Sequence, residues 1–250
     1  MKIAWCFYGQ PRKLELGHKN IDSYLKKFDY KDVDFFCHAW YNDNSFINQS
    51  PWSIKREGQL KITKDFLNKI IEIYNPKKYL FEKENKFENY IEELENSLIN
   101  KTNNVSNVLS GCYSTQKTVE LLKDFAIENN INYDFVFVSR YDFLKPIELN
   151  INSVSNKYMY STDIHIKTNR IIPSPALLCG GFYIINKIYS NLFSNIFLYK
   201  NDENTKKFIE ENLKEKFYVN HEEVLLCNIF FNGANILNDV KFTNNIPNFI

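Results

Sequence analysis

The chain has 250 residues, of which 44% are hydrophobic and 24% charged, a composition typical of a globular protein with a buried core. Its formal net charge of +1 gives no basic excess, so we expect no nucleic-acid partner. The five cysteines contain no CxxC pair, which argues against a disulfide framework or a structural zinc site, and no apolar run approaches the roughly 20 residues of a membrane span. We therefore expect a soluble, cytoplasmic protein.

Strands and helices are predicted to alternate through the first 145 residues. The hydrophobic spacing predicts strands at residues 2–8, 34–40, 78–82 and 133–139, helices at 14–28, 63–74, 87–98 and 113–129, and a polar loop at 100–107. Thr63 is a candidate N-cap for the second helix. This alternation is typical of βαβ units and predicts an α/β fold with a mostly parallel central sheet flanked by helices.

The second half of the chain has a more mixed pattern. Strands are predicted at residues 157–161 and 180–185, and helices at 187–199 and 222–231. No linker, internal repeat or low-complexity tract separates the halves, so we expect one domain over residues 1–250.

Three predicted strands end in polar residues, at 8–12, 38–41 and 140–142. Ligands of open parallel sheets bind beyond the carboxyl ends of the strands, so these ends should converge on one site. Gly9 permits close backbone approach and Arg12 offers a forked cation suited to phosphate, although a tight turn with a solvated arginine is the alternative. Neither GxGxxG nor GxxxxGK[ST] occurs, which argues against a dehydrogenase and a P-loop NTPase.

Arg140, Tyr141 and Asp142 directly follow the most hydrophobic predicted strand. A carboxylate at this position can ligate a divalent cation that in turn binds a diphosphate. Arg140 can neutralise the same phosphates or hold the carboxylate of Asp142. The alternative is an ion pair that merely ends the strand.

Residues 2–12, the strand end His38-Ala39-Trp40 and the segment from Tyr133 to Asp142 together resemble bacterial and viral surface-polysaccharide glycosyltransferases with a GT-A fold. In that family a short acidic motif, DxD or a variant, follows a central strand and binds a metal–nucleotide-sugar complex. The resemblance implies a GT-A-like, Rossmann-like fold with a nucleotide-binding half at residues 1–145 and an acceptor-side half at 146–250. Here Arg140 replaces the first acidic residue, which leaves Asp142 as the candidate ligand for Mn or Mg and lets Arg140 supply positive charge itself.

The resemblance also implies roles for individual residues. The candidate donor-site residues are Tyr8, Gly9, Arg12, Arg140, Tyr141, Asp142, Gly180 and Gly181. The candidate catalytic bases are Asp163, Glu222 and Glu223. Other interpretations stay open: a β-bulge for the two later glycines, a polar loop around Asp163, and for the two glutamates the first turn of a helix capped by Asn220.

The leading hypothesis is therefore a glycosyltransferase that moves a sugar from a nucleotide-sugar donor to a hydroxyl of a surface glycan, of the capsule or lipooligosaccharide type. Its expected partners are the nucleotide-sugar and the glycan acceptor, and lipid-linked acceptors would bring it to the inner membrane surface. The alternatives are a glycan-binding protein without turnover and a sugar-phosphate nucleotidyltransferase.

Overall fold

The computed structural model describes residues 1–48, 59–95, 105–161, 164–167, 170–173 and 175–201, together with residues 203, 207, 224, 225, 228 and 229. A six-stranded sheet runs through its centre, in the order β5 (Lys78–Lys83), β2 (Val33–Tyr41), β1 (Ile3–Tyr8), β6 (Phe135–Arg140), β10 (Leu177–Gly180) and β7 (Met159–Ser161). The first four strands are parallel, whereas β10 is antiparallel to both β6 and β7. The predicted α/β class with a mostly parallel sheet is confirmed, and the sheet is mixed.

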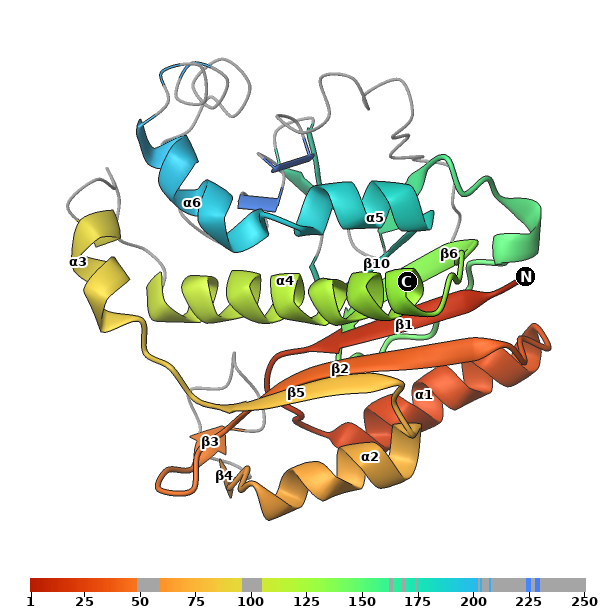
Figure 1. Cartoon of the computed structure of the whole chain (residues 1–250), viewed down its shortest axis with the longest axis horizontal. Coiled ribbons are helices and arrows are strands. Elements are labelled where there is room, and N and C mark those ends of the chain that lie inside the picture. Colours follow the sequence, from red (N-terminus) through yellow and green to blue (C-terminus); the bar gives the residue numbers. More distant parts are fainter. Residues whose placement is uncertain are drawn as a thin grey trace.

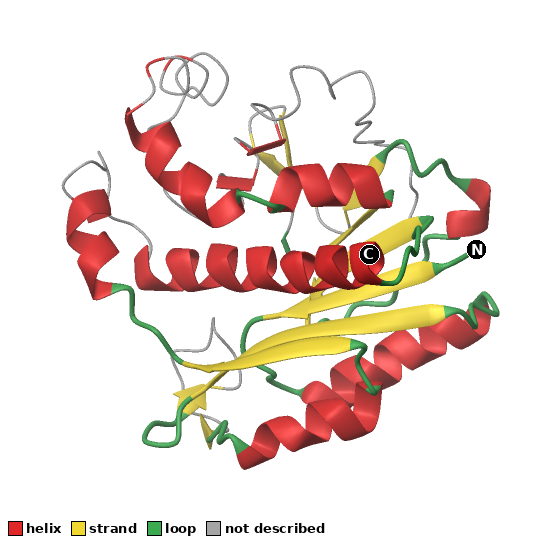
Figure 2. Ribbon diagram, viewed as in Figure 1, coloured by secondary structure: helices red, strands yellow, loops and turns green. Residues whose placement is uncertain are grey.

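Helices cover both faces of this sheet (Figures 1 and 2). One face carries α1 (Leu14–Lys27) and α2 (Asn68–Tyr74), and the other carries α4 (Val105–Glu128), α5 (Phe182–Tyr189) and α6 (Leu192–Asn201), with α3 (Glu88–Glu95) beside the start of α4. The remaining elements are two strand pairs, β3 (Ile47–Asn48) with β4 (Gln59–Leu60) and β8 (Ile164–Lys167) with β9 (Arg170–Pro173), and two 3-10 turns, η1 (Asp65–Leu67) and η2 (Ile151–Ser153).

The hydrophobic core has two parts, one on each face of the sheet. All six residues of β1 are buried, because the strand is covered on both sides. Ala4 and Cys6 belong to the cluster under α4, while Trp5 and Phe7 belong to the cluster under α1. The Trp5 ring stacks on Phe137 with 4.4 Å between centroids. Two-sided burial explains why this strand has no polar alternation in its sequence.

The chain changes direction across the sheet at β1. From β1 it passes through α1 to β2 and through α2 to β5, each strand lying further from β1 on the same side. The long helix α4 then crosses the opposite face and returns the chain to β6, on the other side of β1 (Figure 1). Ligands of such sheets bind where the strand order reverses. The carboxyl ends of β1 and β6 are therefore the expected position of a ligand.

The strand predicted at residues 180–185 is wrong. β10 ends at Gly180 and α5 begins at Phe182, and the helix predicted at 187–199 is divided between α5 and α6. The run from Phe182 to Ile185 is apolar at every position, so its hydrophobicity fits a strand as well as a buried helix. The burial of Ile184, Ile185 and Ile188 at helical spacing decides for the helix.

Other element boundaries differ by smaller amounts. α4 begins at Val105, inside the predicted loop at 100–107, because Val108, Leu109 and Cys112 continue its buried face towards the N-terminus. The region predicted as a helix at 63–74 starts as the turn η1, and Thr63 accepts a hydrogen bond from the Phe66 amide at 3.1 Å, which confirms its capping role. The end of the helix predicted at 87–98 and most of the one at 222–231 lie outside the described residues.

Candidate functional site

The carboxyl ends of β1 and β6 lie side by side at the switch point. Tyr8, the last residue of β1, is in register with Arg140, the last residue of β6. The two segments that follow these strands therefore begin next to each other, one with Gly9 and the other with Tyr141 and Asp142. The predicted convergence of these two polar strand ends on one edge is confirmed by this pairing.

Gly9 turns the chain away from the sheet and is held on both sides. Its φ of +90° is a conformation that glycine adopts far more readily than residues with a side chain. The Gly9 amide donates to the hydroxyl of Ser114 on α4 at 2.7 Å, and the Gly9 carbonyl accepts from the Trp40 amide of β2 at 3.4 Å. The turn that leads to Arg12 is thus fixed to a helix and to the neighbouring strand.

Arg140 and Asp142 form a bidentate ion pair. Arg140 Nε donates to Asp142 Oδ1 at 2.8 Å, and Nη2 donates to Oδ2 at 2.6 Å. The Asp142 side chain is 9% exposed and that of Arg140 is 32% exposed, so the carboxylate lies beneath a guanidinium that reaches the surface. The carboxylate holds the guanidinium plane in a defined orientation. Of the two roles considered for Arg140 towards Asp142 and phosphate, the structure shows it holding the carboxylate.

Arg12 lies close to this pair. Burial and, after it, the charge of Arg140 lower the pKa of Arg12, while Asp142 and Glu84 act in the opposite direction. Arginine stays protonated in proteins, so two cationic guanidinium groups lie near the switch point. Arg12 Nη2 donates to Gln10 Oε1 at 2.5 Å, whereas its Nε is buried and has no hydrogen-bond partner among the described residues.

Glu84 completes the charged groups at this edge. It follows β5 and accepts hydrogen bonds from Gln10 Nε2 at 3.3 Å and from Asn42 Nδ2 at 2.9 Å. Gln10 therefore bonds to both Arg12 and Glu84, and it links the segment after β1 to the segment after β5. The guanidiniums of Arg12 and Arg140 and the carboxylates of Asp142 and Glu84 thus lie at the same edge of the sheet, and each carboxylate opposes the lowering of the Arg12 pKa.

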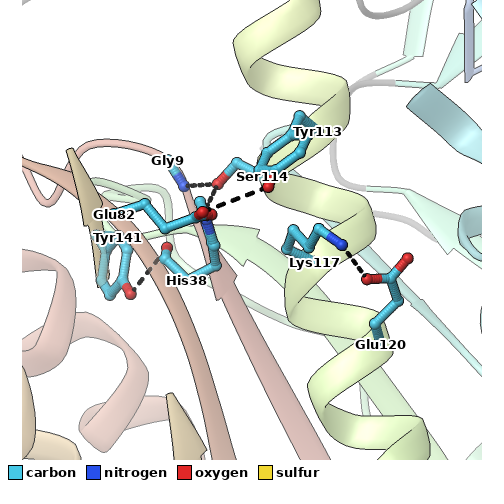
Figure 3. A network of polar contacts seen from close by, with 8 residues as sticks. All are labelled: Gly9, His38, Glu82, Tyr113, Ser114, Lys117, Glu120 and Tyr141. Carbon is cyan, nitrogen blue, oxygen red and sulfur yellow. Dashed lines mark hydrogen bonds and ion pairs between the residues drawn. The ribbon is translucent and has the colours of Figure 1, made fainter. Parts of the chain in front are cut away.

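A polar network links β1, β2, β5 and α4 beside these strand ends (Figure 3). His38 on β2 is fully buried, with Nδ1 2.7 Å from Ser114 Oγ and Nε2 2.8 Å from Glu82 Oε2. Burial lowers the pKa of His38 and Glu82 acts against it, while the hydrogen bond from His38 lowers the pKa of Glu82. These shifts favour a neutral His38 imidazole beside an ionised Glu82 carboxylate. The Tyr141 hydroxyl donates to the His38 carbonyl at 3.2 Å, so the network also reaches the segment after β6.

Asp142 was predicted as a metal ligand, and its surroundings are a poor donor set for a divalent cation. Both of its oxygens accept from Arg140, so a cation there would share the carboxylate with a guanidinium. Within the residues that the structure describes, no three His, Cys, Asp or Glu side chains are grouped to hold a metal ion. The metal role of Asp142 stays a prediction.

The other predicted donor-site residues lie in different places. The Tyr8 hydroxyl donates to the Pro175 carbonyl at 2.6 Å, close to the crevice. Gly180 pairs with Val136 near the start of β6, which is the opposite end of the sheet from Arg140. The close approach that Gly181 allows is to the chain itself, because a Cβ there would lie 2.2 Å from the Asn156 carbonyl oxygen. The structure therefore does not bring the two later glycines together with the arginines.

The three predicted catalytic bases, Asp163, Glu222 and Glu223, lie outside the described residues. Their roles stay predictions.

Several residues of the site were missed. Glu82 and Glu84 come at and just after the end of a predicted strand, so the strand-end rule applied to the segment at 78–82 would have identified them. Ser114 lies inside a helix and nothing in its local sequence distinguishes it. Gly17 on α1 was also missed, although a Cβ there would lie 1.9 Å from the Tyr141 carbonyl oxygen. That contact seats the Arg140–Asp142 segment directly against α1.

No model of a known protein family matches the chain, and no characterised protein matches its sequence. The geometry of the site and the sequence motifs are therefore the basis for assigning a function. Within the described residues, no helix combines the length and the apolar composition that crossing a membrane requires.

Proposed function

We propose that the chain is a glycosyltransferase of GT-A-like fold that takes a sugar from a nucleotide-sugar donor to a hydroxyl of a surface glycan. The observation that carries this proposal is the approach of Arg12 and Arg140 at the topological switch point of the sheet. Switch-point crevices of α/β sheets commonly hold nucleotides. Two guanidiniums at such a crevice suit the diphosphate of a nucleotide-sugar, because the planar fork of arginine matches phosphate oxygens.

The charges fit the chemistry of glycosyl transfer. In this reaction the acceptor hydroxyl oxygen forms a bond to the anomeric carbon of the sugar, and the bond from that carbon to the diphosphate oxygen breaks. The electron pair of the broken bond leaves with the nucleoside diphosphate, and the hydroxyl proton passes to a base. Negative charge therefore grows on the diphosphate, and in this proposal the cations Arg12 and Arg140 stabilise it. Asp163, Glu222 and Glu223 remain the proposed candidates for the base.

The buried position of Arg12 supports an anionic ligand in particular. Its Nε is enclosed without a partner in the described part of the chain, and Arg140 nearby lowers its pKa. A diphosphate near the two guanidiniums would relieve the repulsion between them. An apolar or cationic ligand would not.

Nucleotide binding is the first property to test. Melting curves of the protein with UDP, GDP, CMP and dTDP and their sugar conjugates, with and without manganese, test the donor class. A ligand at 100 times its dissociation constant adds about 2.7 kcal/mol of stability. For a chain of this size that corresponds to a rise in Tm of roughly 5–10 °C. If a chelator abolishes the rise in Tm, the diphosphate binds through a metal ion as well as through the arginines.

A paired variant then tests the site itself. Arg140→Gln with Asp142→Asn removes both charges with little change in volume, so neither residue keeps an unpaired buried partner. Losing one charge-assisted contact of about 1.5–3 kcal/mol should weaken nucleoside diphosphate binding roughly 10- to 150-fold in calorimetric titration. Lys26→Gln is the matched control, because Lys26 is an exposed cation near the far end of α1. Equal affinities of the paired variant and the control would rule out the arginine site.

Product analysis separates the three classes of function. Release of a nucleoside diphosphate from a nucleotide-sugar, accelerated by an acceptor glycan, identifies a glycosyltransferase. Formation of a nucleotide-sugar and pyrophosphate from a sugar phosphate and a nucleoside triphosphate identifies a nucleotidyltransferase. Binding of glycans without any effect of nucleotides on the melting curve would refute the proposal in favour of a glycan-binding protein.

A further inference from the structure

The two segments that carry the arginines are both tied to one buried residue, His38 (Figure 3). The His38 side chain bonds to Ser114, which accepts the amide proton of Gly9, three residues before Arg12. The His38 carbonyl accepts the hydroxyl proton of Tyr141, which stands between Arg140 and Asp142. These contacts join the ends of β1, β2 and β6, and Glu82 adds the end of β5.

The hydrogen bonds of this network have a consistent direction. The Glu82 carboxylate can only accept, so the proton of the neutral imidazole is on Nε2 and is donated to Glu82. His38 Nδ1 is then an acceptor for the Ser114 hydroxyl proton, while Ser114 Oγ accepts from the Gly9 amide. Since His38 and Ser114 are fully buried, the loss of either one leaves the facing polar atom of the other without this partner and without access to water.

The network can restrain the two segments at this edge, whose cations Arg12 and Arg140 repel each other. Burial and, after it, the charge of Arg140 lower the pKa of Arg12, and the bonds of Gly9 to Ser114 and of Tyr141 to His38 hold the two segments in place against the repulsion. Gly9 alone would let the first segment move, since glycine is the residue with the most backbone freedom. The bond from Gly9 to Ser114 removes that freedom.

We propose that His38 is a positioning residue of the site: through Ser114 and Gly9 it holds the segment that carries Arg12 in place beside the segment that carries Arg140. His38 itself touches neither the donor nor the acceptor. This inference rests on the proposed function for its ligand, but the coupling between His38 and the two segments can be tested without one.

Two substitutions of His38 divide its side-chain contacts. In His38→Asn the amide oxygen lies near the position of Nδ1 and keeps an acceptor for Ser114. In His38→Gln the amide nitrogen reaches the position of Nε2 and keeps a donor to Glu82. Both variants lose the contact of the ring with Trp40, whose centroid lies 4.8 Å away, and Asn, the smaller side chain, leaves the larger void. Ser114→Ala removes the same link from the helix side and serves if His38→Gln does not fold.

The expected result is an unequal effect on ligand binding. Calorimetric titration with the nucleoside diphosphate that stabilises the wild type, and with inorganic pyrophosphate, should show about tenfold weaker binding for His38→Gln and Ser114→Ala. His38→Asn should lose clearly less. In an Arg12→Gln background, His38→Gln should cost little more, because its effect passes through Arg12. Equal losses in the Asn and Gln variants, or a full additional loss in that background, would overturn the proposal.

Hydrogen exchange of the unliganded protein provides the second measurement. Peptides that cover residues 9–13 should exchange faster in His38→Gln and Ser114→Ala than in His38→Asn. If the wild type binds neither nucleotides nor pyrophosphate, the proposed function fails, and faster exchange at 9–13 still supports the coupling. Unchanged exchange at 9–13 in both link-breaking variants overturns it, whatever the wild type binds.

Discussion

Gly17→Ala should destabilise the protein, although the same change in an exposed helix stabilises it by up to about 1 kcal/mol. An added Cβ would lie 1.9 Å from the Tyr141 carbonyl oxygen, and real Cβ atoms essentially never approach a neighbour below 3.0 Å. Because cores are close-packed, α1 or the Tyr141 segment has to move by roughly 1 Å. Overpacking of this kind costs about 1–3 kcal/mol or more. We expect a net loss of roughly 1–2 kcal/mol after the gain in helix propensity.

Chemical denaturation followed by circular dichroism measures this loss, and a fall in Tm of about 2–4 °C per kcal/mol should accompany it. Ser23→Ala is the control, because Ser23 is an exposed residue of the same helix and its change should stay within about 0.5 kcal/mol. Nucleotide affinity should fall in Gly17→Ala as well, since Tyr141 lies between Arg140 and Asp142. A variant as stable as the wild type, or more stable, would refute the close seating of α1 against this segment.

Three further predictions concern other parts of the fold. Burial lowers the pKa of His38, so the contribution of His38 to stability is full above the ordinary value of 6.5. Below that pH the free energy of unfolding falls by at most about 1.4 kcal/mol per pH unit. In denaturation experiments on His38→Asn, the free energy of unfolding should depend less steeply on pH. Tyr133→Phe removes a 2.8 Å hydrogen bond to the buried carboxylate of Asp34 and should cost about 1–3 kcal/mol in urea denaturation. Gly181→Ala should lower the free energy of unfolding by about 1–3 kcal/mol, because the added Cβ clashes with Asn156. Nucleotide affinity should stay unchanged, and weaker nucleotide binding would indicate that Gly181 belongs to the donor site.

Elements with a single compatible hydrophobic period were predictable from the sequence. The strand predicted at 133–139 corresponds to β6 at Phe135–Arg140, because β-branched and aromatic residues fill positions that are buried on both faces. The segment at 182–185 is equally apolar, but a strand there would follow a glycine that the packing uses as a helix N-cap. The antiparallel direction of β10 likewise depends on tertiary pairing and has no local signal.

The residues of the site that directly follow a strand were predictable from the sequence. The residues that contact the site from a distant part of the chain were not. Gly9, Arg12, Arg140 and Asp142 stand directly behind two central strands, and the chain order alone indicated their convergence. Ser114 contacts Gly9 from a helix more than a hundred residues away, and only the crossing of α4 over β1 brings it there. Gly180 and Gly181 were predicted to let a ligand approach, whereas the structure shows parts of the chain itself close to both glycines. A glycine in the sequence permits close approach but does not indicate which group approaches.

Some features that cost stability lie at the carboxyl edge, and others lie elsewhere, because Asp29, Asn75 and Asn130 have a positive φ near the opposite ends of β2, β5 and β6. Gly9 has a positive φ, His38 is an ionisable group without solvent exposure, and both Arg12 Nε and Trp40 Nε1 are buried without partners in the described part of the chain. A sequence selected for stability alone would fill these positions with apolar or fully paired groups. Proteins keep such local exceptions mainly where function requires them. The same edge holds the cations Arg12 and Arg140, whose repulsion is offset in part by Asp142 and Glu84 and would be offset further by an anionic ligand.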